Sequence, residues 1–192
     1  MALFVLVILA LLAFVLWAVD ISAGEGDHCD TQSVAGITKA VTFLIKRDTH
    51  PLQNNPARIA EISVALCDAG SHYEVDPYLL TAMAWYESHF QPAILSLKKK
   101  GKAGEKGLLQ VGKQGAGSCP YFMDDVAGQA LCGARWLSQA YRECGDGASD
   151  DNAVAMYADG TTCDKRKSTH LKWVVNRRIN LRNRLKNMVI DR

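Results

Sequence analysis

The chain has 192 residues, which gives room for one domain with a substantial buried core. Hydrophobic residues make up 48% of it and charged residues 22%, proportions that are ordinary for a globular protein. The net charge is only +2, so no overall field favours a nucleic-acid partner, and none is predicted.

The first twenty residues differ in composition from the rest. Residues 2–19 are apolar and carry no charge, and as a helix they would span about 27 Å, close to the roughly 30 Å hydrocarbon core of a membrane. No lysine or arginine occurs before Lys39, which favours export of the C-terminal part. We therefore predict a transmembrane signal-anchor over residues 1–20 and a linker over 21–30. A cleaved signal peptide is the alternative, and in either case the domain lies outside the cytoplasm, anchored to the membrane or secreted.

Six cysteines lie beyond the apolar segment. They form no C-x-x-C pair and no histidine lies in an H-E-x-x-H pattern, so neither a metal nor a cofactor is predicted. An even number of cysteines in an exported domain indicates disulfides, with buried free thiols as the alternative for some of them. The spacing does not select one pairing, although we favour Cys144 with Cys163 and Cys29 with Cys67.

Residues 31–192 are predicted to form one all-α domain, because apolar residues recur at helical spacing and no alternating run is long enough for a strand. Pro56 and Asp76 mark two helix starts, and Gly70 marks a helix end. Asp150 and Asp151 are expected to cap a later helix. The helices are expected at residues 31–47, 56–70, 76–90, 124–143, 150–157 and 170–189.

Glu87 is the most informative residue of the helix over 76–90. Leu80 and Met83 precede it at helical spacing, so its carboxyl is expected on the apolar face. Partial desolvation and the negative end of the helix dipole are expected to favour the protonated form. A carboxyl that keeps its proton near neutral pH serves as a general acid. The alternative is an amphipathic helix whose last turn reaches water.

Two segments are rich in basic residues. Residues 98–107 combine lysine with glycine, which indicates a flexible loop. It is either a solvated surface loop or a mobile lip over a cleft that meets an anionic polymer. Basic residues also gather over 165–192, either as the polar face of the last helix or as a surface for anionic wall polymers or membrane headgroups.

Short motifs follow one another in a defined order. They are ESHF at residues 87–90, GLLQV at 107–111 and AMYADG at 155–160. In this order, with a helix start before the first, they resemble the soluble lytic transglycosylase family, whose fold goose-type lysozymes share. The family pattern is E-S-x-F, then G-L-M-Q, then a segment like A-Y-N-A-G. The resemblance covers roughly residues 56–160 and implies a lysozyme-like helical domain.

The resemblance also implies a reaction and its residues. The substrate would be peptidoglycan, cut at the β-1,4 bond between N-acetylmuramic acid and N-acetylglucosamine with formation of a 1,6-anhydro product. Glu87 would act first as the acid and then as the base. Tyr157 would hydrogen-bond the carboxyl of Glu87, Gln110 would contact the sugar, and Ser88 would assist near the cleaved bond. The alternatives are structural: Gln110 ties its own motif together, and Tyr157 packs in the core.

The chain departs from the family pattern at two positions. Leu109 replaces methionine, a change of similar volume that is expected to be harmless. Ala158 replaces asparagine and removes an amide, which keeps open a non-catalytic wall-binding protein on the same fold. A hydrolytic lysozyme is the other alternative, if an aspartate positions a water. The candidates are Asp124, Asp125, Asp150, Asp151 and Asp159.

Several biological settings fit such an enzyme. It would serve the remodelling of a bacterium's own wall, the insertion of a secretion apparatus, or phage entry and lysis. Its partners would be the glycan strands of peptidoglycan, the membrane through residues 2–19, and components of an apparatus or a virion.

Overall fold

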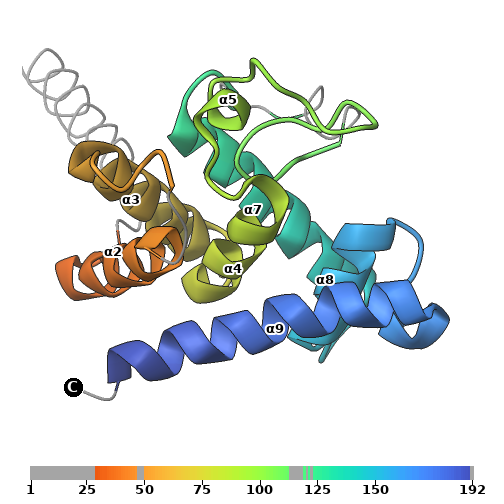
Figure 1. Cartoon of the computed structure of the whole chain (residues 1–192). Helices are drawn as coiled ribbons and strands as arrows, with labels where there is room; N and C mark the ends of the chain where they lie inside the picture. The colour runs from red at the N-terminus through yellow and green to blue at the C-terminus, as the bar shows by residue number, and fades with distance from the viewer. Residues whose placement is uncertain (1–28, 47–49, 113–118, 120, 122, 191–192) are drawn as a thin grey trace, which may run out of the picture.

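The structure is a computed structural model of the chain, and it describes residues 29–46, 50–112, 119, 121 and 123–190 (Figure 1). The signal-anchor expected over residues 1–20 lies outside the described residues, as does the linker up to residue 28. Among the helices in the described ranges, none is both long enough and apolar enough to cross a bilayer.

The described residues form helices joined by loops, which confirms the all-α prediction for this part of the chain. The described part of the chain contains one isolated antiparallel bridge, between Lys106 and Val111. The short elements α5 and η1 were not predicted. In chain order the elements are α2 (Thr31–Lys46), α3 (Pro56–His72), α4 (Pro77–Ser88), α5 (Pro92–Leu95), α7 (Val126–Glu143), α8 (Asp150–Asp159), η1 (Lys165–Lys167) and α9 (Thr169–Ile190).

Side-chain caps fix the starts of the helices that carry the site. Asp76 accepts a hydrogen bond from the backbone N–H of Tyr78 at 3.0 Å, at the start of α4. Asp125 does the same for α7 by accepting from Gly128 at 2.5 Å. Each cap satisfies a backbone donor that the first helical turn leaves unpaired.

Two helix ends differ from the predictions. The helix α3 continues past Gly70 to His72, and the glycine instead permits a close approach, because a Cβ there would come within 2.7 Å of Pro77. The cap of α8 is Ser149, whose side chain and that of Asn152 form a reciprocal capping box. Asp150 therefore lies inside the first turn of α8 and does not cap it.

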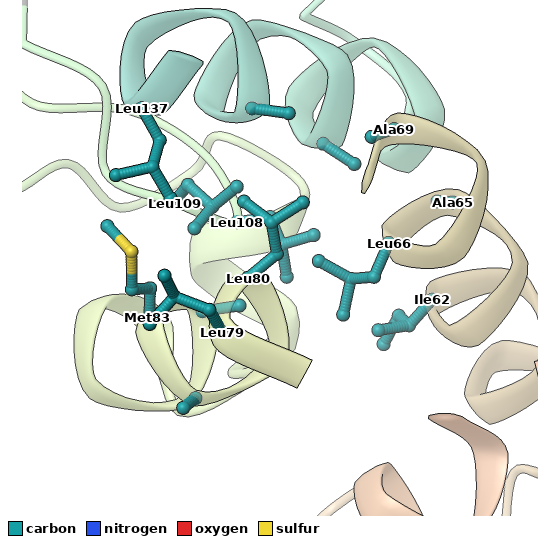
Figure 2. Close-up of a cluster of buried hydrophobic side chains, with 14 of the residues drawn as sticks. Ile62, Ala65, Leu66, Ala69, Leu79, Leu80, Met83, Leu108, Leu109 and Leu137 are labelled. Atoms are coloured by element: carbon teal, nitrogen blue, oxygen red, sulfur yellow. The ribbon is translucent and has the colours of Figure 1, made fainter. Parts of the chain in front are cut away.

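The helix α4 lies at the centre of the domain. It packs against α2, α3 and α9, and the long helix α9 also packs against α8, as Figure 1 shows. Figure 2 shows the apolar side chains that α3, α4 and α7 bring together, with two leucines of a loop among them. Those leucines are Leu108 and Leu109, and both are fully buried. The second sequence motif is therefore anchored in the core.

Leu109 packs directly against Gly133 of α7. A Cβ at position 133 would lie 2.2 Å from Cδ1 and 2.5 Å from Cβ of Leu109, so the glycine is required for this contact. We expect Gly133→Ala to lower the free energy of unfolding by about 1–3 kcal/mol, as overpacking does. Chemical denaturation measures the change. In the double variant with Leu109→Ala the two losses should be less than additive, and full additivity would contradict the contact.

Disulfides join three parts of the domain. The pairs are Cys29 with Cys67, Cys119 with Cys132 and Cys144 with Cys163, so both favoured pairs are present. They close loops of 38, 13 and 19 residues. Each such cross-link typically stabilises a domain by about 2–4 kcal/mol. Through the first of them, the end of the expected linker is tied to α3.

Candidate active site

Glu87 lies in the last turn of α4, where its side chain is 20% exposed. The motif around it ends the helix sharply: His89 and Phe90 both adopt positive φ, 48° and 51°. Such left-handed backbone is uncommon for residues other than glycine and has to be held by its surroundings. Phe90 is completely buried, and the backbone N–H of His89 donates to Trp85 at 2.9 Å. The local sequence thus fixes the direction in which Glu87 leaves the helix.

Ser88 is part of this helix end. Its side chain is buried, and its hydroxyl donates to the carbonyl of Ala84 at 2.9 Å. The same hydroxyl accepts from the backbone N–H of Phe90 at 3.2 Å. Since its single proton is used inside α4, the structure gives Ser88 a role in the backbone turn. Nothing in this geometry brings it toward a sugar.

His50 supports the turn from a different part of the chain. Its Nδ1 accepts a hydrogen bond from the backbone of Leu52 at 3.1 Å, so Nε2 carries the ring proton. That Nε2 donates to the carbonyl of His89 at 2.7 Å. The carbonyl just beyond the helix end is therefore satisfied by a buried imidazole.

The partner of Glu87 comes from α9, far along the chain. Arg178 donates from Nη2 to Oε1 of Glu87 at 2.5 Å, and the two side chains are only 11% and 20% exposed. The guanidinium also donates to the carbonyl of Val174 at 3.1 Å. Arg178 is thus a buried cation beside the carboxyl of Glu87, and the reasoning from α4 alone did not include it.

The same face of α9 reaches the other end of α4. Asp76 lies 3.2 Å from Arg182 and 2.9 Å from Lys186. Arg182 is also 2.6 Å from Asp150 of α8. Part of the basic cluster over 165–192 therefore binds acids inside the domain, which neither interpretation of that cluster anticipated. These ion pairs hold α9 along α4 at both ends.

A cavity of about 490 Å³ opens between α7, α8 and the loop before α7. This volume lies within the range of about 300–1,000 Å³ that is usual for ligand sites. Among the four predicted site residues, Gln110 and Tyr157 line it. Its acidic lining residues are Glu105 and Glu143. The lysine- and glycine-rich segment thus contributes a wall of the cavity through Ala103 and Glu105.

Gln110 closes its own motif, as the structural alternative predicted, and it also lines the cavity. Its side-chain amide donates to the carbonyl of Gly107 at 2.9 Å, which closes the motif on itself. Its backbone has a φ of 47°, and the residue lines the cavity. Because the amide nitrogen is partly occupied by Gly107, its carbonyl oxygen is the group with more free hydrogen-bonding capacity.

Tyr157 connects the cavity with Glu87. Its hydroxyl donates to the carbonyl of Leu109 at 2.8 Å, so its one proton does not go to the carboxyl of Glu87 as predicted. Burial raises the pKa of Tyr157, and the negative charge of Glu87 raises it further. The hydroxyl therefore stays protonated at neutral pH and close enough to Glu87 to feel its charge. Ala158, at the position of the family's asparagine, is exposed on α8.

The sequence also matches the model of a known protein family. The model of the transglycosylase SLT domain matches residues 66–179, which is more than half of the chain. The chain belongs to the transglycosylase SLT domain family. Searches of the curated proteins and of the solved structures found no significant match.

The SLT match includes the four predicted site residues and also Arg178. A peptidoglycan-acting function of the transglycosylase type is therefore supported. The family match ends within α9, shortly after the arginine that contacts Glu87.

Gln129 is a second residue of the SLT domain that the sequence did not reveal. It is fully buried in α7, and its Oε1 accepts from the backbone N–H of Leu108 at 2.8 Å. Its amide donates to the carbonyls of Leu95 and Met123, both at 2.8 Å. Gly107 has a φ of 73° and would place a Cβ 2.8 Å from this side chain. One polar residue amid apolar neighbours in the 124–143 helix was the signal that could have identified it.

The aspartates proposed for a water-positioning role lie elsewhere. Asp125 caps α7, Asp150 binds Arg182, and Asp151 binds Lys165. None of the five aspartates is among the residues that line the cavity. Within the described ranges, no three His, Cys, Asp or Glu side chains are grouped so as to hold a metal ion.

Proposed function

We propose that the domain is a lytic transglycosylase that cleaves the β-1,4 bond between N-acetylmuramic acid and N-acetylglucosamine in peptidoglycan. The position of Glu87 carries this proposal. It is a largely buried carboxylate at the end of the central helix, bound to Arg178 and within electrostatic range of Tyr157, which lines the cavity. The SLT match over these residues supports peptidoglycan as the substrate.

The proposed reaction uses Glu87 in two protonation states. Protonated Glu87 gives its proton to the glycosidic oxygen as the bond from that oxygen to C1 breaks, and an oxocarbenium-like state forms on the muramic acid ring. The resulting carboxylate then takes the proton of the C6 hydroxyl while O6 bonds to C1. Glu87 ends protonated, no water is consumed, and the product carries a 1,6-anhydro ring.

Arg178 fixes one oxygen of the Glu87 carboxyl. Its Nη2 donates to Oε1 at 2.5 Å. The first step requires a proton on Glu87, and the contact leaves Oε2 as the oxygen to carry it. We therefore assign Arg178 a positioning role, in which it orients the carboxyl of Glu87.

The cavity offers polar groups suited to a sugar. Trp136 lines it, and its buried indole N–H has no hydrogen-bond partner among the described residues. Because this N–H has almost no accessible surface, Trp136 presents its ring and not its nitrogen to the cavity. The side-chain oxygen of Gln110, which accepts no hydrogen bond from the residues that the structure describes, would supply an acceptor for a sugar hydroxyl or acetamido N–H. An aromatic wall with a few polar groups is typical of ligand pockets.

The products of digestion test the proposal. Purified peptidoglycan is incubated with the full chain, and the soluble fragments are analysed by mass spectrometry. We expect fragments that end in 1,6-anhydro-N-acetylmuramic acid. Fragments with ordinary reducing ends would contradict the transglycosylase reaction, and an absence of fragments would favour a non-catalytic wall-binding protein.

A hydrolytic lysozyme remains the second candidate because of Glu105. This carboxylate lines the cavity, where Oε2 accepts from the backbone N–H of Ala103 at 2.9 Å. A carboxylate in the cavity, in addition to the acid Glu87, could hold a water for attack on C1. If Glu105 does this, Glu105→Gln abolishes reducing-end products. If the transglycosylase reaction is correct, the variant still forms anhydro products.

We also propose that the domain acts on the exported side of the membrane. Its disulfides suit an oxidising compartment, which is where peptidoglycan lies. The apolar segment over residues 2–19 would then attach the domain to the membrane. Cell fractionation before and after an alkaline carbonate wash tests this, since an anchored protein stays with the membrane and a secreted one does not.

A further inference from the structure

A row of stacked side chains on α9 leads to the end of α4. His170 and Trp173 stack with ring centroids 6.0 Å apart and planes inclined by 28°. The guanidinium of Arg177 lies 4.3 Å from the centroid of Trp173 and 4.5 Å from that of Tyr86. Tyr86 directly precedes Glu87, so the row ends beside the proposed acid.

Arg177 is held in place without using its hydrogen-bond donors. Two rings contact its guanidinium, and each such contact contributes about 0.5–1 kcal/mol at an exposed site. Within the described part of the chain, no group accepts a hydrogen bond from this guanidinium. Its neighbour Arg178 differs, since it is buried and bound to Glu87. Arg177 is thus exposed, oriented and free to bind an anion.

The free donors of Arg177 favour a carboxylate as the ligand. A planar guanidinium presents a fork of N–H groups that matches the two oxygens of a carboxylate. Trp173 is 52% exposed, but it already stacks with His170 and Arg177. A sugar ring that stacks on Trp173 would compete with these contacts, whereas a carboxylate adds to the row without displacing any of them.

Peptidoglycan carries such carboxylates close to the proposed cleavage site. The lactyl group of N-acetylmuramic acid bears a short peptide with several acidic groups. We propose that Arg177, held between Tyr86 and Trp173, binds a carboxylate of this peptide stem on the muramic acid beside the cleaved bond. This inference rests on the proposed function and adds a preference for glycan strands that retain their peptides.

The test compares two substrates and three variants of the full chain. The substrates are intact peptidoglycan and glycan strands from which an amidase has removed the peptides. Arg177→Gln removes the charge, and Arg177→Lys keeps the charge but not the fork. Arg184→Gln is the matched control, because Arg184 is also exposed on α9 and stacks on an aromatic ring, that of Phe43, at 5.0 Å.

We expect Arg177→Gln to lower kcat/KM on intact peptidoglycan by about five- to tenfold, mainly through KM, with Arg177→Lys in between. On stripped strands the variants and the unchanged protein should be equal, as should Arg184→Gln on both substrates. No loss on intact peptidoglycan, or an equal loss on both substrates, would overturn the inference.

Sedimentation with insoluble walls separates this inference from the proposed function. If the unchanged protein cleaves neither substrate, the proposed function is wrong and binding becomes the readout. Weaker retention of Arg177→Gln than of Arg184→Gln on intact walls, with equal affinity of the two variants for immobilised stripped strands, supports the carboxylate contact. Equal retention on intact walls overturns it.

Discussion

Replacing Glu87 with glutamine is expected to slow glycan cleavage by about 10³-fold or more. General acid–base catalysis typically contributes about 10²–10⁴-fold, and here one carboxyl performs both proton transfers. Glutamine has nearly the same shape but neither donates a proton to the leaving oxygen nor removes one from the C6 hydroxyl. Release of soluble fragments from labelled peptidoglycan, followed over time, measures the loss.

Glu61→Gln is the control for the loss of a charge. Glu61 forms an ion pair with Arg58 at 2.6 Å, and its side chain is 46% exposed on α3. This variant should keep full activity. Thermal melting of both variants establishes that they are folded. Cleavage by Glu87→Gln at the unchanged rate would remove Glu87 as the acid and shift attention to Glu105.

Replacing Arg178, the ion-pair partner of Glu87, is expected to destabilise the domain. Arg178→Met leaves Glu87 largely buried without its cation, and a buried pair that loses one partner typically costs about 3–5 kcal/mol. The residual exposure of 20% at Glu87 reduces this, so we expect a loss of about 2–4 kcal/mol in the free energy of unfolding at neutral pH. Urea denaturation measures it.

A double-mutant cycle attributes that loss to the pair itself. Combining Arg178→Met with Glu87→Gln should cost at least about 1 kcal/mol less than the sum of the single variants, because both charges are then removed together. Arg184→Met, on the exposed side of α9 and with a single ring contact at 5.0 Å, should change stability by less than about 1 kcal/mol. Additive losses in the cycle would show that Arg178 stabilises the domain through packing and not through Glu87.

Local signals in the sequence were sufficient for most of the helices. Helix caps and periodic apolar residues act within a few positions, so Asp76 before Pro77 marked the start of α4 correctly. Two predicted helix ends were wrong for different reasons. Ser149, and not the two aspartates after it, caps the start of α8. Gly70 does not end its helix, because it is needed for the close approach of Pro77.

Contacts between distant segments account for what the sequence did not reveal about the site. Arg178 lies 91 positions from Glu87, and the residue before it is also an arginine, so nothing local separated it from the exposed arginines. The hydroxyl of Tyr157 has one proton, and only the folded chain decides that Leu109 receives it. Motif resemblance supplied the residues, but their partners depend on tertiary packing.

The disulfides connect some of the described elements of the domain covalently and leave others joined by noncovalent contacts. They link the segment before α2 to α3, the loop before α7 to α7, and the end of α7 to the segment after α8. Neither α4 nor α9 contains a cysteine. Glu87 and Arg178 thus face each other across the interface of α4 and α9, which is held by packing and ion pairs and by no disulfide. The proposed acid therefore lies where the two helices are joined only by noncovalent contacts. A shift of α9 would change the contact between Arg178 and Glu87 without breaking a covalent bond.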